Sequence, residues 1–355
     1  MAFPFNDDHD MIREAAQGFM QDWYEGGKGP ERIYESGAGY DAAAWQSFAG
    51  ELGMAGIAIP EEFGGAGLGD LGRAVVMEEL GASLCSIPFA PTCTIAADMI
   101  SAIGSDEAKS NWLPKIAAGE VIIAYADGLE ALTLDGDKLS GQIRNVLYGK
   151  EADLLLVTVR SGESIKLLGL AKGQDGVSIS ANETMDPTRS LSSVTLNGAA
   201  LKDTAKLGGG SQEQLDRAVK SSMISLAAEC VGGAQKCLDM TVEYLGQRVQ
   251  FDRPIASFQA IKHRCADMFI QIEAARSAVY AAALAEPSQK VKLALIAKAY
   301  ASDAFFDVAG HAIQLHGGIA YTMEHPAHLY WRRAQTGQWL FGSSDRFRDL
   351  YLSAM

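Results

Sequence analysis

Apolar residues change their spacing twice along the chain. Over residues 8–119 they recur at helical intervals, and the run 76–84 places its apolar side chains on one face. Over residues 121–201 they form short β-branched and leucine runs, such as 154–159, which glycines separate at strand-and-turn spacing. This pattern predicts a helical region followed by an antiparallel sheet or a small barrel.

The helical signal returns after the glycine run 208–210 and persists almost to the end. One long helix is predicted by seven apolar residues at alternating steps of three and four: Phe258, Ile261, Cys265, Met268, Ile272, Ala275 and Val279. Residues 215–230 repeat that spacing, and a third helix is expected over about 290–315. Helices of this kind pack as a bundle.

The predicted fold is therefore mainly α with a central β domain. Residues 1–120 form an N-terminal helical domain, residues 121–205 a middle β-barrel or sheet, and residues 206–355 a C-terminal four-helix bundle.

Charge and composition narrow the function classes. The 355 residues carry 30 Lys and Arg against 44 Asp and Glu, a net charge of −14, with both signs interspersed. Such a surface does not suit nucleic acid or an anionic membrane, which need concentrated positive charge. The first eight residues lack the basic and apolar regions of a leader peptide, so we expect a cytoplasmic protein. Five widely spaced cysteines, an odd number, are expected to be reduced.

Three segments in the N-terminal part carry a resemblance to a known family. They occur in the order ELGMAGIAIPEEFGG (51–65), EELG (78–81) and WLPKIAAGE (112–120). In this order they resemble the acyl-CoA dehydrogenase family, and the similarity continues to the C-terminus. The resemblance implies the three-domain fold, FAD as cofactor, and α,β-desaturation of an acyl-CoA thioester.

The segment RVQFDRPI (248–255), followed by FQAIKH (258–263), is similar to a family segment that reaches a neighbouring subunit's FAD. The resemblance implies that Arg248 pairs with the pyrophosphate, which a planar guanidinium can grip through two charge-assisted bonds. It also implies that Phe251 packs near the flavin. An ordinary surface arginine is the alternative interpretation.

The segment QLHGG (314–318), followed by YTMEHP (321–326), resembles the family's second interface motif. The resemblance places Gln314, Gly317 and Gly318 at the adenosine end of FAD, where glycines allow close approach of the backbone. A Gly-Gly pair alone is also a common helix C-cap. Four nearby histidines lack an acidic or cysteine partner at metal spacing, so no metal is expected: His311, His316, His325 and His328.

The residue that removes the α-proton is not apparent, although this reaction requires a general base. Phe341 occupies the position of the usual family glutamate, and a phenyl ring cannot accept a proton. Ser222, beside Met223, occupies the alternative position on an earlier helix. Glu229 lies two turns further along that helix, too far for a simple substitution, and Glu324 is a displaced candidate. The catalytic residue stays unassigned.

The middle domain also departs from the family pattern. Residues 125–131 and 145–149 stand where the family has the loop and strand that hold the flavin ring. The motifs that act on a neighbour's cofactor are kept. This combination resembles the short subunits of α2β2 acyl-CoA dehydrogenases that act on bulky thioesters, including steroid side chains.

Three interpretations follow from these departures. The first is an enzyme subunit whose longer homologous partner supplies the base, with an electron-transferring flavoprotein as electron acceptor. The second is a homo-oligomeric dehydrogenase with a displaced base such as Glu324. The third is a silent scaffold subunit that keeps the fold without the chemistry.

Overall fold

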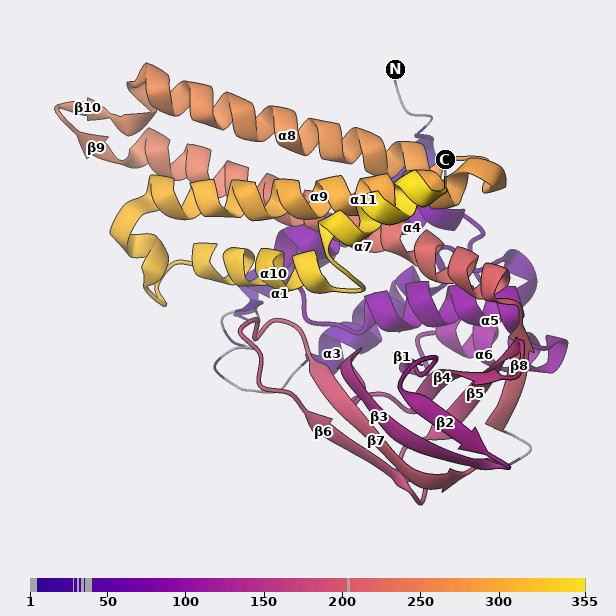
Figure 1. The fold of residues 1–355 in the computed structure, drawn as a ribbon. Helices are drawn as coiled ribbons and strands as arrows, with labels where there is room; N and C mark the ends of the chain where they lie inside the picture. The colour runs from indigo at the N-terminus through magenta and orange to yellow at the C-terminus, as the bar shows by residue number, and fades with distance from the viewer. Residues whose placement is uncertain are drawn as a thin grey trace. The chain divides into compact units, whose positions relative to one another are not determined.

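The computed structural model describes residues 5–27, 29, 30, 32, 35, 40–202 and 205–354. Residues 1–4, part of the N-terminal stretch on which the expected location rests, lie outside this set. Elements follow the predicted order of helices, strands and helices (Figure 1). In the described part of the chain, every helix is too short or too polar to cross a membrane.

The N-terminal region is helical, as its apolar spacing predicts. Residues 76, 77, 80 and 84 are all at most 4% exposed, although Leu84 follows the last residue of α4 and residues 71–78 are buried on every side. Local polar contacts start the helices: the Ser105 hydroxyl accepts the Ala108 N–H and caps the last of them. The helices are α1 (Asp7–Glu25), α3 (Ala42–Trp45), α4 (Gly69–Ser83), α5 (Ala97–Ile103) and α6 (Asp106–Ala117). Short 3-10 or π-helical turns are η1 (Gln46–Glu51), η2 (Met54–Gly56), η3 (Glu61–Phe63) and η4 (Ala90–Ala96).

The β region forms two four-stranded sheets. One has the order β1-β4-β5-β8 and the other β2-β3-β7-β6. Five of the six strand pairs in these sheets are antiparallel. The sixth is parallel and joins β1 to β4, with Ile123 opposite Leu154. The strands are β1 (Ile123–Asp127), β2 (Leu132–Asp135), β3 (Lys138–Leu147), β4 (Leu154–Ser161), β5 (Ser164–Ala171), β6 (Val177–Ala181), β7 (Leu191–Ala200) and β8 (Lys206–Gly210).

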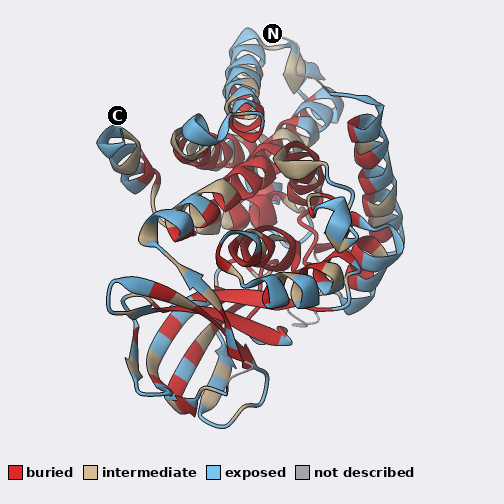
Figure 2. Ribbon diagram, turned by 90° about the vertical axis from the view of Figure 1, so that its right-hand side faces the viewer, coloured by how far each residue is buried: buried red, intermediate tan, exposed pale blue. Residues whose placement is uncertain are grey.

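Long helices make up the C-terminal region, with α8 packed on α9 and α9 on α10 and α11. The predicted stripe of α8 is buried only in its second half. Residues 268, 272, 275 and 279 are covered, whereas 258, 261 and 265 are half-buried (Figure 2). The elements are α7 (Gln212–Gln247), β9 (Val249–Gln250), β10 (Arg253–Pro254), η6 (Ile255–Ser257), α8 (Gln259–Ala283), α9 (Pro287–His316), η7 (Gly317–Tyr321), α10 (Ala327–Trp339) and α11 (Ser344–Ser353).

Two compact units are not contiguous in sequence. Unit 1 comprises Met1–Ser36, Ala74–Cys85 and Met223–Met355, and unit 2 comprises Gly37–Arg73 and Ser86–Ser222. The predicted boundaries at residues 120 and 205 remain predictions.

Within unit 1, two glycines allow α4 and α7 to cross closely. A Cβ on Gly81 would lie 2.0 Å from the Glu229 carbonyl oxygen, and one on Gly232 would lie 1.8 Å from the Glu78 carbonyl oxygen. Neither position can hold a larger residue without moving backbone. Gly81 and Gly232 therefore mark the point where the two helices cross.

Candidate functional site

Arg248 begins a two-stranded hairpin directly after α7. Its N–H donates to the Tyr244 carbonyl at 2.8 Å, and its own carbonyl accepts the Ile255 N–H at 2.9 Å. These bonds close the base of the hairpin, in which Gln250 pairs with Arg253. The Arg248 side chain is exposed in this chain. Its backbone is fixed while its guanidinium is available for a group from outside.

Phe251 and Asp252 form the tip of this hairpin. Both have positive φ, +56° and +60°, as a two-residue turn of this type requires. The conformation is unfavourable for a phenylalanine, yet the Phe251 side chain is 84% exposed and gains little from burial. Phe258 supports the tip: its ring lies 6.0 Å from that of Phe251 and 3.8 Å from the Arg253 guanidinium carbon. The fold thus displays an aromatic ring at the cost of local strain.

The Gly317–Gly318 pair lies where α9 ends. Gly317 has φ +68° and its N–H donates to the Ile313 carbonyl, so it also serves as a C-cap. A Cβ on either glycine would meet no heavy atom within 4 Å, and Gln314 and Gly318 are exposed. The backbone here is open to approach from outside the chain.

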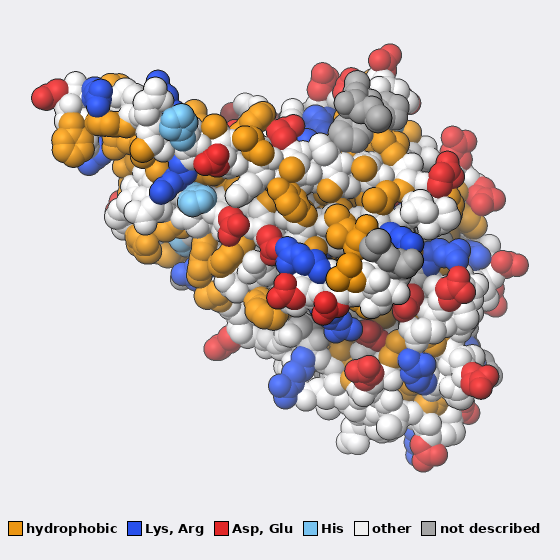
Figure 3. Space-filling view, turned by 45° about the horizontal axis from the view of Figure 1, so that its top comes forward, with side chains coloured by type: hydrophobic (Ala, Val, Ile, Leu, Met, Phe, Trp, Pro, Cys, Tyr) orange, Lys and Arg blue, Asp and Glu red, His pale blue; other side chains and the backbone are white. Residues whose placement is uncertain are grey.

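The ends of α7 and α9 lie side by side, which brings the two predicted motifs together. The rings of Tyr244, on α7, and His316, on α9, stack with centroids 4.7 Å apart. All five predicted cofactor residues therefore lie in one region of unit 1. Hydrophobic, basic and histidine side chains gather over the end of the molecule that carries β9 and β10 (Figure 3).

The position of the usual base lies in a tight turn between α10 and α11. Phe341 is half-buried with φ +64°, and the Gly342 N–H donates to the Trp339 carbonyl at 3.1 Å. Asp303, on α9, accepts the Ser344 hydroxyl at 2.6 Å and so holds the start of α11. The turn presents a ring and no proton acceptor.

Ser222, at the alternative position, is fully buried beside a carboxylate. Its hydroxyl lies 3.1 Å from Asp98 Oδ2 and 3.0 Å from the Ala218 carbonyl. Asp98 receives two bonds from Arg73, at 2.7 and 2.9 Å. Burial raises the pKa of Asp98, and Arg73 opposes that shift. Both carboxylate oxygens of Asp98 are thus engaged in bonds within the chain.

The remaining candidates differ in exposure. Met223 is 1% exposed and has no proton-accepting group. Glu229 is buried and pairs with Arg333 at 2.6 Å. Glu324 is exposed in the segment after η7. Each of these positions except Glu324 is closed to a substrate by burial or pairing.

Residues 125–131 and 145–149 stand where the family has its flavin-ring segments, and their side chains form hydrogen bonds within the chain. Tyr125 and Thr158 hydroxyls lie 3.1 Å apart, and Thr158 donates to Asp127 at 3.3 Å. Burial raises the pKa of Tyr125. In the second stretch, Asn145 accepts an Asn182 amide N–H at 3.3 Å. These groups are therefore engaged in hydrogen bonds within the chain.

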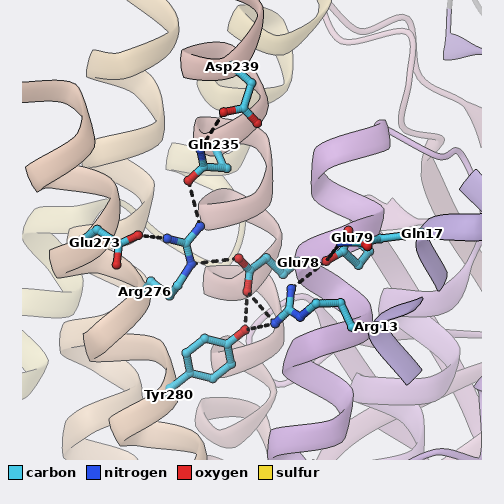
Figure 4. Close-up of polar contacts among 9 residues, drawn as sticks. All are labelled: Arg13, Gln17, Glu78, Glu79, Gln235, Asp239, Glu273, Arg276 and Tyr280. Carbon is cyan, nitrogen blue, oxygen red and sulfur yellow. Dashed lines mark hydrogen bonds and ion pairs between the residues drawn. The ribbon is translucent and has the colours of Figure 1, made fainter. Parts of the chain in front are cut away.

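A polar cluster unrecognised in the sequence joins α1, α4, α7 and α8 within unit 1 (Figure 4). Glu78 accepts from Tyr280 and, at 2.9 Å, from Arg276. Arg13 contacts Glu79 at 2.6 Å and Tyr280 at 2.8 Å. The cluster borders a cavity of about 380 Å³. Acidic and basic side chains are paired around the cavity. We therefore interpret the cluster as a structural joint that fixes α1 on the helical bundle.

From the sequence, no metal is expected at the histidines, and a polar-surface or hydrogen-bonding role is the alternative. Among the described residues, no three His, Cys, Asp or Glu side chains are placed to hold a metal ion. The structure instead stacks His316 between Tyr244 and His325, whose centroid lies 4.4 Å from that of His316. The aromatic at Tyr244, one turn before Arg248, was the available signal.

Comparisons with known proteins identify the family of both helical regions. Residues 6–120 match the family described as acyl-CoA dehydrogenase, N-terminal domain, and residues 214–355 match acyl-CoA dehydrogenase, C-terminal domain. The chain is 36% identical over 344 residues to acyl-CoA dehydrogenase IpdE2 of Mycolicibacterium smegmatis, covering 95% of each protein.

Two solved structures have the same fold. Butyryl-CoA dehydrogenase from Megasphaera elsdenii is 26% identical, with a TM-score of 0.89 over 100% of this chain and 99% of that one. A chain of the ChsE4-ChsE5 complex from Mycobacterium tuberculosis is 26% identical, with a TM-score of 0.86 over 98% and 97%.

Proposed function

The chain belongs to the acyl-CoA dehydrogenase family, and from this premise we propose that it shares its active site with a longer homologous subunit. Its cofactor is FAD, and its reaction class is α,β-desaturation of an acyl-CoA thioester. Bound FAD supplies the hydride acceptor for the β-carbon. Removal of the α-proton needs a base, and the partner subunit contributes it.

The observation that carries this proposal is Phe341 at the position of the family's glutamate. Asp303 and a backbone hydrogen bond within the turn fix the conformation around Phe341. A small movement of the turn therefore cannot bring a carboxylate to the place of the ring. Ser222 and Glu229 are buried and bonded within the chain. A base from a second subunit completes the chemistry.

The residues of the hairpin and the glycine turn fit one half of an FAD site. Arg248 would hold the pyrophosphate and Phe251 would lie near the flavin, while Gln314, Gly317 and Gly318 would receive the adenosine end. The exposure of Arg248, Phe251, Gln314 and Gly318, and the open space above both glycines, support that assignment. The bonded residues of the middle region do not fit the ring-holding half, which the partner would supply.

The surface of α8 supports a partner. Phe258, Ile261 and Cys265 are half-buried, and Phe269 and Ile270 are 50% and 63% exposed. Apolar side chains concentrated on one projecting helix mark a contact surface. A homologous longer subunit, a bulky acyl-CoA, an electron-transferring flavoprotein as acceptor and a cytoplasmic location complete the proposal.

The test compares FAD retention in the co-expressed complex of this chain and the longer homologue. Arg248→Gln removes the charged, two-bond donor, and we expect FAD to bind about 10–100-fold more weakly. Arg217→Gln, which removes an exposed arginine paired with Glu213, should leave FAD binding unchanged. Equal FAD binding by wild type and Arg248→Gln would refute the assignment, and absence of flavin from every preparation would favour a silent scaffold.

A further inference from the structure

A short column of three rings connects the two parts of the proposed cofactor half-site. His316 is 3% exposed and lies between Tyr244, stacked at 26°, and His325, tilted at 51°. The Tyr244 carbonyl accepts the Arg248 N–H at the base of the hairpin. Gly317 follows His316 directly. The column therefore joins the last turn of α7, which the hairpin follows, to the end of α9, which the glycine turn follows.

Hydrogen bonds fix the protonation of both imidazoles. His316 Nδ1 lies 2.8 Å from the Ala312 carbonyl oxygen, which can only accept, so this nitrogen carries the proton. His325 Nδ1 accepts the Ala327 N–H at 3.2 Å, so this nitrogen carries none. Among the described residues, His316 Nε2 is buried without a hydrogen-bond partner.

A second proton fits neither ring. On His316 it would create a buried N–H donor at Nε2 with no acceptor, together with a buried charge. On His325 it would place an N–H against the N–H of Ala327. Both rings are therefore neutral in this arrangement.

The neighbouring groups also disfavour positive charge. The titratable and charged groups placed against the rings come from α7 (Tyr244), α9 (His316) and α10 (His328 and Arg332). Burial, then His316 and His328, lower the pKa of His325; burial, then Arg332, lower that of His328. Below pH 6.5 an unfolded segment binds more protons than the ordered one, so acid destabilises the ordered form.

We propose that Tyr244, His316 and His325 are positioning residues. As a neutral stack they hold the hairpin and the glycine turn in fixed positions relative to each other. Protonation of the imidazoles releases both segments together. The consequence for the cofactor rests on the proposed function. The coupling of the two segments does not, because it follows from contacts within this chain.

The test measures hydrogen exchange of residues 245–258 and 317–326 at about one pH unit above and below 6.5, corrected for intrinsic rates. In the wild-type chain both segments should exchange faster at the lower pH. The exchange rate should increase by up to about tenfold for each unit by which the ordered structure lowers an imidazole pKa. Residues of α4 serve as an internal reference.

Variants separate the stack from its titration. His316→Ala should raise exchange of both segments at both pH values. His316→Phe combined with His325→Phe keeps the rings, so protection should remain and the acid effect should shrink to that of His328. His263→Phe, at an exposed histidine on α8, is the control and should behave as wild type.

The inference is overturned if wild-type exchange does not depend on pH, if the two segments respond independently, or if the double variant keeps the full acid effect. The same exchange measurements on the FAD-loaded complex then report whether the column affects cofactor binding. Because the first readout needs no flavin, a complex with the longer homologue that never binds FAD would refute the proposed function while leaving the column tested.

Discussion

Replacing Gly232 by alanine tests the crossing of α4 and α7. The new Cβ would lie 1.8 Å from the Glu78 carbonyl oxygen and 2.9 Å from the Ala82 nitrogen. Ordinary contact begins at 3.4 Å, so 3.4 Å less 1.8 Å leaves an overlap of 1.6 Å with backbone. The two helices must separate, because a carbonyl within a helix cannot turn aside.

Two opposing effects determine how much the substitution lowers the free energy of unfolding. Forcing atoms into a packed interior costs about 1–3 kcal/mol, and alanine recovers about 1 kcal/mol of helix propensity. An overlap with backbone lies at the upper end of the first range, so we expect a net loss of about 1–2 kcal/mol in the free energy of unfolding. Glu78 also anchors Arg276 and Tyr280, so the joint in Figure 4 should loosen with it.

Guanidinium unfolding followed by circular dichroism provides the measurement. Gly18→Ala is the matched control, because Gly18 is an exposed interior residue of α1 with no atom within 4 Å of its added Cβ. It should gain about 0.5–1 kcal/mol. If Gly232→Ala is as stable as Gly18→Ala, the close crossing described here is wrong.

Three further changes have defined outcomes. Arg333→Met leaves the buried Glu229 without its 2.6 Å partner and should lower the free energy of unfolding by about 3–5 kcal/mol in denaturant titration; an unchanged midpoint would contradict a paired role. Phe251→Gly relieves a positive φ at an 84% exposed side chain and should stabilise the chain alone by about 1 kcal/mol, while weakening FAD retention in the complex. Asp252→Gly, at φ +60°, should stabilise the chain without that loss, and equal FAD loss in both variants would remove Phe251 from the site.

The sequence predicted the elements well where periodicity reflects contacts within the chain. The stripe from Phe258 to Val279 gave the position of α8 because helical spacing records a buried face. It could not show that the side chains in the first half of the stripe are only half-buried in this chain. A helix face that packs on a partner and one that packs on the chain's own core have the same spacing of apolar residues. The close approach of α7 to Gly81 could not be predicted either, because a glycine in a helical run does not show which backbone passes it.

The candidate site was predictable only as separate motifs. Resemblance located Arg248 and Gly317, but sequence spacing does not reveal that the ends of α7 and α9 meet through Tyr244 and His316. Nor does it show that Ser222 bonds to Asp98, 124 residues away along the chain. Such contacts depend on tertiary packing, which local patterns do not encode.

The central claim is that this chain holds half of a flavin site and no base. It is tested most directly by counting FAD bound per polypeptide, and by reduction of that flavin with acyl-CoA, in the chain alone and in its complex with the longer homologue. We predict no retained flavin in the chain alone, and in the complex one FAD for each pair of different subunits, reduced by substrate. One FAD on every copy of the isolated chain, reduced by an acyl-CoA, would contradict the account.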